Sequence, residues 1–454
     1  MIYILIVLLL TILYIAYRLM DNDFISPAFL FITPFCIALI CSSIYAKKWL
    51  LDLHYNTFFV LLIGCLTFAI TCILIHLTYG KRKKRKLVQK KELKYVPIDV
   101  ETWKIIIIIV IQMCSIYIVI SSMRASLSRY GISGNLTIIM YYYRSYSMFS
   151  DKYAVGISGL AMNLRIFSIA VSYIWAYVIS NNTIIEYKTK NKIYMIISFV
   201  LGIINSVILG SRGEAIQLIV AFIIIYLTLQ KKLNNWKSKV KFKQVVMLIA
   251  IVGVMFITFK GVGDLLGRSS VVATTTTVFD ETAKYLGAEI KNLDLFLENY
   301  TKSRQVWGSQ TFGVILDWID NTFKKGWNIQ SMLIFRKVNG VSLGNVYSTF
   351  GPFVYDFGYI GGSVIMPMVS AAIVQVLYEN ILSTKDNKGF NFMIILNSYI
   401  LFLIMFSFFG ERLCSSLLNF SFYKYLLSWW AVILFIAKIK IRYSNIRNRR
   451  GGLL

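Results

Sequence analysis

Charged residues are scarce in this chain. They make up only 15% of the 454 residues, whereas hydrophobic residues make up 57% and the mean hydropathy is +0.66. An ordinary soluble domain carries about 25% charged residues, so this composition excludes that class and predicts a polytopic membrane protein. The length of the chain therefore counts membrane spans rather than soluble domains.

Histidine and patterned cysteine are also scarce. The chain has two histidines, His54 and His76, and six cysteines without CxxC or HExxH spacing. We therefore predict no metal centre, no cofactor and no disulfide framework. The first apolar run, Ile2 to Tyr17, lacks a basic segment before it and a small-residue cleavage pattern after it. That pattern predicts a retained span rather than a signal peptide.

Acidic residues are outnumbered by basic ones, which gives a net charge of +27. The cations stand in blocks beside apolar runs, as in membrane proteins whose basic loops set the topology and contact anionic lipid. We therefore expect membrane lipids, and not nucleic acid, as the partner of these charges.

Apolar windows long enough to cross a bilayer recur along the chain. A helix needs roughly 20 apolar residues to span the hydrocarbon core. We expect an all-α polytopic membrane protein with about eleven transmembrane helices, near residues 1–19, 24–46, 56–79, 104–123, 156–180, 193–210, 214–230, 244–262, 359–379, 391–409 and 417–437. The predicted parts are an N-terminal bundle of about eight spans (1–262), a large outer loop (263–358), about three C-terminal spans (359–440) and a basic cytoplasmic tail (441–454).

The basic loops orient these spans. The run Lys81–Lys94 is the strongest cytoplasmic marker, and alternation from it also places Lys231–Lys243 and the basic tail inside. We expect an outer N-terminus, a cytoplasmic C-terminus and a large loop that faces out from a bacterial cytoplasmic membrane. The short outer connector Lys47–Asn56 contains His54, which we interpret as a surface histidine rather than a base.

The large loop is where function is expected, because polar side chains can converge there without the cost of lying in lipid. It ends in NVYSTFGPFVYDFGYIGG, Asn345 to Gly362. Apolar residues at helical spacing predict two amphipathic helices, which would lie on the membrane or cap the bundle. Their apolar positions are Leu286, Ile290, Leu293 and Leu297 in the first, and Phe312, Ile315, Leu316, Ile319 and Phe323 in the second.

Three arginines stand at unusual places, one inside a predicted span and two at hairpin tips between spans. Arg212 lies in a glycine-flanked hairpin tip before a helix, where backbone amides and a guanidinium form an anion site, and Glu214 complements the helix dipole. Arg165 lies inside the fifth span and should face a polar cavity or a partner. Arg412 lies at a second outer tip, where Glu411 is an alternative partner for it.

The combination of GSRGE at an outer hairpin tip, one large outer loop and NVYSTFGPFVYDFGYIGG resembles the Wzy-type oligosaccharide repeat-unit polymerases of O-antigen and capsule synthesis. The likeness covers about Met1 to Lys440, with two short stretches at motif level. It implies a membrane glycosyltransferase fold of the C type, lipid-linked sugar substrates, no bound metal, and a flippase and a chain-length regulator as partners.

Two departures from related patterns are visible. Ligase relatives have a histidine in the large outer loop, and this loop has none, which favours a polymerase over a ligase. Some polymerases carry an arginine followed eleven positions later by glycine, but Arg212, Arg268 and Arg336 are followed there by Ile223, Phe279 and Tyr347. The residue roles of that subfamily are therefore not transferred.

If the substrate is an undecaprenyl diphosphate that carries sugars, the reaction is displacement at the anomeric carbon with the lipid diphosphate as leaving group. Guanidinium groups suit that leaving group, and a carboxylate should accept the proton of the attacking hydroxyl. The diphosphate candidates are Arg212, Arg268, Arg336 and Arg412, followed by Arg304 and Arg165. The carboxylate candidates are Asp356, Glu214 and Asp317, and the sugar-binding candidates are Tyr347, Tyr355, Asn345 and Trp307.

Two other functions remain open at this point. A flippase or polysaccharide transporter would also have many helices and an intramembrane arginine, although the chain shows no matching halves of the kind common in transporters. An O-antigen-type ligase would use the same donor with a different acceptor.

Overall fold

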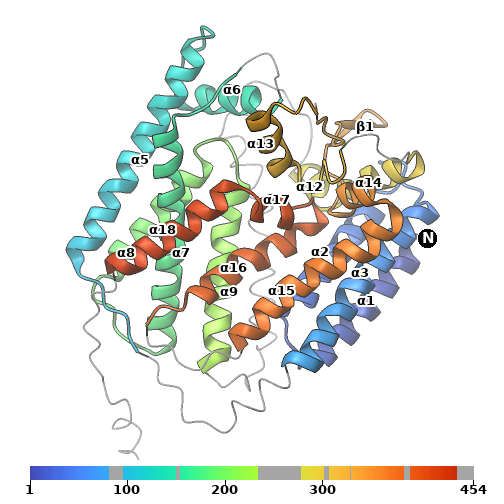
Figure 1. The fold of residues 1–454 in the computed structure, drawn as a ribbon, viewed down its shortest axis with the longest axis horizontal. Coiled ribbons are helices and arrows are strands. Elements are labelled where there is room, and N and C mark those ends of the chain that lie inside the picture. The colour runs from blue at the N-terminus through green and yellow to red at the C-terminus, as the bar shows by residue number, and fades with distance from the viewer. Residues whose placement is uncertain are drawn as a thin grey trace, which may run out of the picture. The chain divides into compact units, whose positions relative to one another are not determined.

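The computed structural model describes residues 1–80, 96–149, 154–233, 278–300, 306–327, 329–382 and 389–436. These residues are mostly helical, with one two-stranded sheet (Figure 1). Seven described helical segments are long and apolar enough to cross a membrane, and three shorter ones are apolar as well. The expectation of an all-α, multi-pass membrane protein therefore agrees with the structure.

The predicted windows coincide with helices, apart from the window near 244–262, which lies outside the described residues. The basic loop at 81–94, the candidates Arg268 and Arg304, and the tail at 441–454 also lie outside them. The chain divides into two compact units, each assembled from separate stretches. The first comprises the described parts of 1–88, 239–383 and 397–423, and the second those of 89–238, 384–396 and 424–454.

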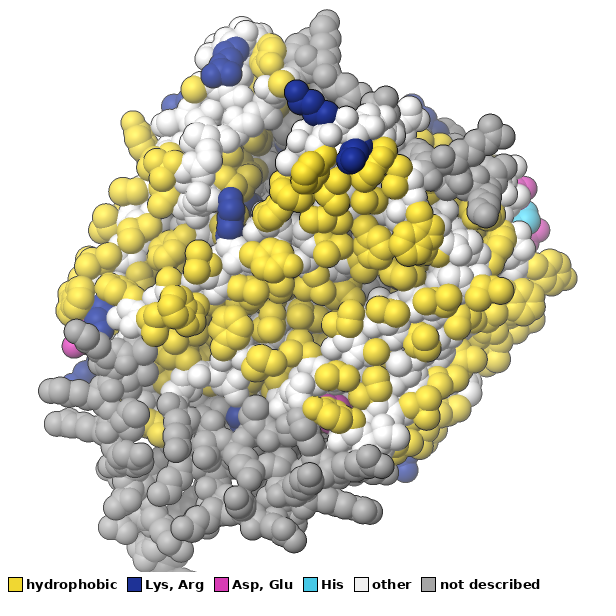
Figure 2. Space-filling model, in the orientation of Figure 1, with side chains coloured by type: hydrophobic (Ala, Val, Ile, Leu, Met, Phe, Trp, Pro, Cys, Tyr) yellow, Lys and Arg dark blue, Asp and Glu magenta, His cyan; other side chains and the backbone are white. Residues whose placement is uncertain are grey.

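Four long helices form the frame of the first unit: α1 (Ile2–Leu19), α2 (Pro27–Ile44), α3 (Tyr55–Ile75), which continues into η1 (His76–Gly80), and α15 (Met366–Leu382). Aromatic rings fill its interior, where Phe31 stacks on Phe68 with 3.9 Å between ring centroids. The outward face of α1 is apolar, and Tyr3 and Val7 are 68% and 62% exposed. Hydrophobic side chains cover most of the described surface seen in Figure 2, as contact with lipid requires.

The two ends of the first unit hold different loops. At one end, Lys48 of the connector between α2 and α3 pairs with Asp280 of α12 (Val278–Glu298) at 2.7 Å. At the other end, His76 Nδ1 lies 2.6 Å from Glu379 Oε1, and Tyr378 donates to Asp23. The connector and α12 both belong to loops predicted to face out, and which side of a membrane they face stays a prediction.

Helix α12 packs across α2 and α3, and Ile290, Leu293 and Leu297 of its predicted apolar stripe are fully buried. This amphipathic helix therefore caps the bundle. The second one, α13 (Gly313–Phe323), has no buried residue. Strands β1 (Arg336–Val338) and β2 (Val341–Gly344) follow as an antiparallel hairpin, whose Leu343 packs with Trp49 beneath α12.

The end of the large loop forms a bent helical pair. Helix α14 (Phe350–Ile360) runs into η2 (Gly361–Ile365) and α15, a stretch of 33 residues. As one straight helix it would be about 50 Å long, well beyond a hydrocarbon core of about 30 Å. Gly358 breaks it with a φ of +71°, and a Cβ on Gly362 would lie 2.6 Å from the backbone nitrogen of Val354. Glycine at these two positions permits the bend and the close packing across it.

The second unit contains α5 (Thr102–Ser128), α6 (Leu136–Phe149), α7 (Gly159–Ile184), α8 (Lys192–Val207) and α9 (Gly213–Leu233). Helix α7 is its most buried span. Buried polar side chains connect its helices: Gln112 donates to the Ser168 carbonyl at 3.1 Å, and Ser198 donates to Gln112 at 2.6 Å. Helix α16 (Phe392–Met405) begins in this unit and ends in the first, and η3 (Phe406–Phe408), α17 (Leu413–Leu417) and α18 (Phe420–Ile436) follow it.

Candidate functional site

Two breaks, by which we mean segments of non-helical backbone, meet inside the first unit. The first is the segment between β2 and α14, and the second lies between α16 and α17. Ser348 forms a parallel bridge with Gly410, and the N–H of Thr349 donates to the Ser407 carbonyl at 2.8 Å. Non-helical backbone at membrane depth occurs where protein buries it or where it lines a cavity. Each break thus supplies backbone partners for the other, at a place where Ser348, Thr349 and Ser407 are buried by protein.

A small cavity lies against these breaks. It has room for about one water molecule, and the hydroxyl-bearing residues Thr349, Ser370 and Ser407 are part of its lining. The remaining lining residues are apolar: Phe31, Phe68, Phe353, Pro367, Ile404 and Leu413.

Tyr347 and Arg336 form a clamp at the first break. Tyr347 is 1% exposed, its hydroxyl donates to the Ile334 carbonyl at 2.7 Å, and Arg336 Nε donates to that hydroxyl at 3.0 Å. Burial raises the pKa of Tyr347, and Arg336 partly offsets this. Tyr347 is therefore enclosed by its own loop, while Arg336 uses one of its five N–H donors in this contact.

Glu411 and Arg412 follow the second break, and they have separate roles. The Glu411 carboxylate accepts the N–H groups of Cys414 at 2.7 Å and of Ser415 at 2.9 Å, at the start of α17. Burial raises the pKa of Glu411. Residue Arg412 is exposed as a whole, and its guanidinium carbon lies 5.8 Å from the ring centroid of Phe409. Desolvation by the surrounding protein nevertheless lowers the pKa of Arg412, and the charge of Glu411 partly offsets this. Glu411 therefore caps α17, and its charge also acts on Arg412, so the expected partnership exists beside the cap.

Asp356 braces a turn of the large loop. Its carboxylate accepts the N–H of Thr311 at 2.7 Å, the N–H of Gln310 at 3.1 Å and the Ser309 hydroxyl at 3.2 Å. This fastens the turn before α13 to α14. Such a carboxylate has little free acceptor capacity in this conformation.

The other loop candidates occupy varied environments. Trp307 is 70% exposed and contacts Phe357 edge to face at 4.8 Å, so one face of its ring is available. Asn345 and Tyr355 are half-buried. Asp317 is exposed on α13, and partial desolvation together with the neighbouring Asp320 raises its pKa.

Arg165, Arg212 and Glu214 lie in the second unit. Arg165 is 4% exposed, forms an ion pair with Glu214, and donates to the Asn205 carbonyl at 3.0 Å and the Ser206 carbonyl at 3.1 Å. It thereby satisfies carbonyls at the end of α8 that lack helical partners. Arg212 is buried at the hairpin tip. The role observed for Arg165 is to join the end of α8 to the start of α9.

The structure brings together some predicted residues and adds others. The two breaks bring together three predicted residues, Arg336, Tyr347 and Arg412. Two residues with long-range contacts were not among the predicted site residues. Arg144 donates to the Gly210 carbonyl, and His54 contacts Asp294, which lies 240 positions away. No local pattern in the sequence signals either contact.

Comparison of the chain with family models, with curated proteins and with solved structures gives no match.

Proposed function

We propose that this chain is a membrane glycosyltransferase that polymerises oligosaccharide repeat units carried on a polyprenyl diphosphate, with donor and acceptor both lipid-linked. The observation that carries the proposal is the meeting of two non-helical breaks within an apolar unit. Arg336 is bonded to one of them through Tyr347, and Arg412 stands directly after the other. The first break belongs to the segment Asn345–Gly362, on which the resemblance to repeat-unit polymerases also rests.

The proposed reaction requires cations at the leaving group. When the anomeric carbon is attacked, negative charge develops on the lipid diphosphate, and fixed guanidinium groups stabilise that charge best where water is excluded. Arg412 is exposed and Arg336 keeps four N–H donors beyond its contact with Tyr347. Both can therefore bind phosphate oxygens without breaking a contact that the described residues depend on.

The attacking hydroxyl also needs a proton acceptor. Asp356 and Glu214 are carboxylate candidates, but the first holds the 309–311 turn and the second holds Arg165. Asp317 is exposed and is the freer of the three. The proposed location is the outer face of a bacterial cytoplasmic membrane, where a repeat-unit flippase would supply the substrate and a chain-length regulator would end the reaction.

The test is polymerisation by the purified protein in liposomes that contain lipid-linked repeat units, followed as a ladder of glycan lengths. Arg412→Ala should lower the rate by about 100- to 1,000-fold, the cost of one preorganised charge-stabilising donor. Arg18→Ala is the matched control, because Arg18 is an exposed arginine of α1. Absence of any product longer than one repeat from intact wild-type protein with active substrate would refute the proposal.

A transporter is the second candidate, and the helix broken at Gly358 favours it, because discontinuous helices also form substrate sites in transporters. The same liposomes separate the two functions. A transporter moves the lipid-linked sugar to the other leaflet with its length unchanged, whereas a polymerase lengthens it. A ligase would lengthen nothing and would transfer the glycan to an acceptor of another kind.

A further inference from the structure

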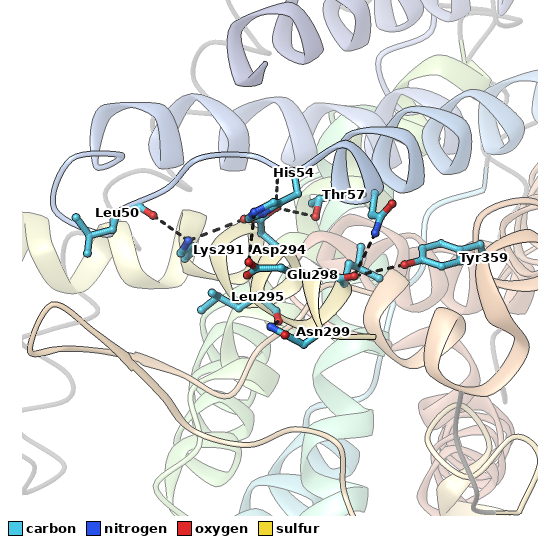
Figure 3. Close-up of polar contacts among 11 residues, drawn as sticks. Leu50, His54, Thr57, Lys291, Asp294, Leu295, Glu298, Asn299 and Tyr359 are labelled. Atoms are coloured by element: carbon cyan, nitrogen blue, oxygen red, sulfur yellow. Dashed lines mark hydrogen bonds and ion pairs between the residues drawn. The ribbon is translucent and has the colours of Figure 1, made fainter. Parts of the chain in front are cut away.

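His54 and Asp294 form a pair that the proposed diphosphate site does not use. His54 stands directly before α3, and Asp294 comes from the buried face of α12, so the pair joins the short outer connector to the large loop (Figure 3). The Asp294 side chain is fully buried, while the His54 side chain is 42% exposed. A buried carboxylate behind an exposed imidazole is an arrangement that can move protons.

The contacts of Asp294 fix the orientation of the imidazole. Asp294 accepts the Thr57 hydroxyl at 2.8 Å, the His54 backbone N–H at 2.9 Å and His54 Nδ1 at 3.0 Å. Lys291 Nζ lies 3.9 Å away. Three donors and a cation around one carboxyl group is the environment that an ionised carboxylate needs, and an ionised carboxylate only accepts hydrogen bonds. Nδ1 of His54 therefore carries hydrogen, and the lone pair of the neutral ring is on Nε2.

Nε2 faces away from Asp294, and none of the residues that the structure describes donates a hydrogen bond to it. Its nearest charged neighbour is Glu298 Oε1 at 3.5 Å, which is too long for a good hydrogen bond but close enough to stabilise an imidazolium (Figure 3). The Glu298 side chain is itself 43% exposed. A hydroxyl that approaches from solvent can thus reach Nε2, and Glu298 is placed to stabilise the cation that forms.

The pair is also connected to the segment Asn345–Gly362. Tyr359, beside the bend at Gly358, donates its hydroxyl to the Leu297 carbonyl at 3.4 Å, and Asn56 donates to the same carbonyl at 3.4 Å (Figure 3). The Tyr359 ring lies 5.3 Å from that of Tyr300, and burial raises the pKa of Tyr300. Aromatic rings beside a polar pair are a surface on which a sugar ring can stack.

We propose that His54, oriented by Asp294, accepts the proton of the sugar hydroxyl that attacks the anomeric carbon. This inference rests on the proposed glycosyltransferase function. The hydroxyl oxygen forms the new bond to the anomeric carbon, and the bond from that carbon to the phosphate oxygen breaks with its electron pair on the lipid diphosphate. The proton passes to Nε2 and from there to water. Asp294 is a positioning residue, and Glu298 stabilises the imidazolium.

The same contacts fasten the start of α3 to α12, and this structural role can be separated from the chemical one. The structural role uses the backbone N–H and Nδ1 of His54, whereas proton transfer uses Nε2. Asparagine at this position offers an amide nitrogen in place of Nδ1 and nothing in place of Nε2. His54→Asn should therefore keep the bond to Asp294 and the melting temperature, and lose the proton acceptor.

The decisive experiment measures polymerisation against pH in liposomes for wild type, His54→Asn and His54→Ala, with Asp52→Asn as the control for an exposed residue of the same connector. We expect His54→Asn to be about 100- to 10,000-fold slower, the usual contribution of a general base. Added imidazole should restore part of the rate of His54→Ala, and the dependence on protonation seen in wild type should disappear. A His54→Asn protein within threefold of wild type would overturn the inference, while the loss of activity in Arg412→Ala would still stand for the proposed function.

A second measurement does not depend on polymerisation. Diethyl pyrocarbonate modifies accessible neutral imidazole nitrogens. No lysine or arginine lies between the only two histidines, His54 and His76, so chymotrypsin, which cleaves after aromatic residues such as Tyr55 and Phe68, is used to place them in different peptides. His76 is 2% exposed, so it serves as the internal control. We expect rapid modification of His54 that hydroxylamine reverses and that lipid-linked substrate slows. Equal or slower modification of His54 than of His76 would show that Nε2 is not accessible and would overturn the proposal.

Discussion

The ion pair between Arg165 and Glu214 gives the sharpest test of the packing in the second unit. The Arg165 side chain is 5% exposed and that of Glu214 is 34% exposed. Removing one partner of a fully buried pair costs about 3–5 kcal/mol, because the other charge is left without compensation. Since Glu214 is one-third exposed, solvent reduces its share, and we expect Glu214→Gln to cost about 2 kcal/mol. Arg165→Met should cost more, about 3–4 kcal/mol, because it also leaves the Asn205 and Ser206 carbonyls without their donor.

The assay is thermal unfolding of the detergent-solubilised protein, read as the melting temperature of each single variant and of the double variant Arg165→Met, Glu214→Leu. The double variant should be more stable than the sum of the single effects predicts, because no unpaired charge remains. Additive effects of the two substitutions would show that the side chains do not interact. An unchanged melting temperature for Arg165→Met would refute the reasoning on its structural role altogether.

Three further predictions concern the first unit. Gly362→Ala should lower the melting temperature, because its Cβ would lie 2.6 Å from the Val354 backbone nitrogen. Gly313→Ala is the control and should leave the melting temperature unchanged, because a Cβ there would have nothing within 4 Å. Equal effects of the two substitutions would contradict the tight bend. Asp356→Asn should weaken the turn at 309–311 by about 1–3 kcal/mol and speed proteolysis there, and an unaltered cleavage rate would count against the brace. Burial raises the pKa of Glu289 well above its ordinary value, and among the described residues its carboxylate oxygens have no hydrogen-bond partner. The folded state therefore keeps a proton that the unfolded state releases above about pH 4.3. Wild type should lose stability as pH rises from there toward the folded pKa of Glu289, at up to about 1.4 kcal/mol per pH unit. Glu289→Gln should flatten that slope, and parallel curves of stability against pH for the two proteins would contradict this prediction.

Much of the fold could be predicted from the sequence because membrane spans are set by local composition. Each apolar window is long enough to satisfy its own backbone as a helix, so its position needs no knowledge of its neighbours. The amphipathic stripe at Ile290, Leu293 and Leu297 was equally readable, and all three residues are fully buried. Spacing alone left open whether that stripe would face lipid or the bundle, since both environments are apolar.

The site was less readable, because its geometry depends on residues far apart in the chain. Arg165 was correctly expected to need a polar cavity or a partner, but its acceptors come from the end of α8 and from Glu214. The bridge between Ser348 and Gly410 joins two loops that share no pattern. His54 was interpreted as a surface histidine, and it is half-exposed. The orientation of its imidazole is set by Asp294, which lies 240 positions away on α12.

The pairing of the two breaks explains how this unit accommodates non-helical backbone N–H and C=O groups beside its apolar helices. A break leaves N–H and C=O groups without helical partners, and each would cost several kcal/mol in lipid. Here one break supplies the partner of the other, since the Thr349 N–H donates to the Ser407 carbonyl, and Glu411 satisfies the N–H groups of Cys414 and Ser415. The two segments therefore stabilise each other. A change that separates them should disturb the placement of Arg336 and Arg412 at the same time, so the proposed diphosphate site and the fold of this end of the unit depend on the same few hydrogen bonds.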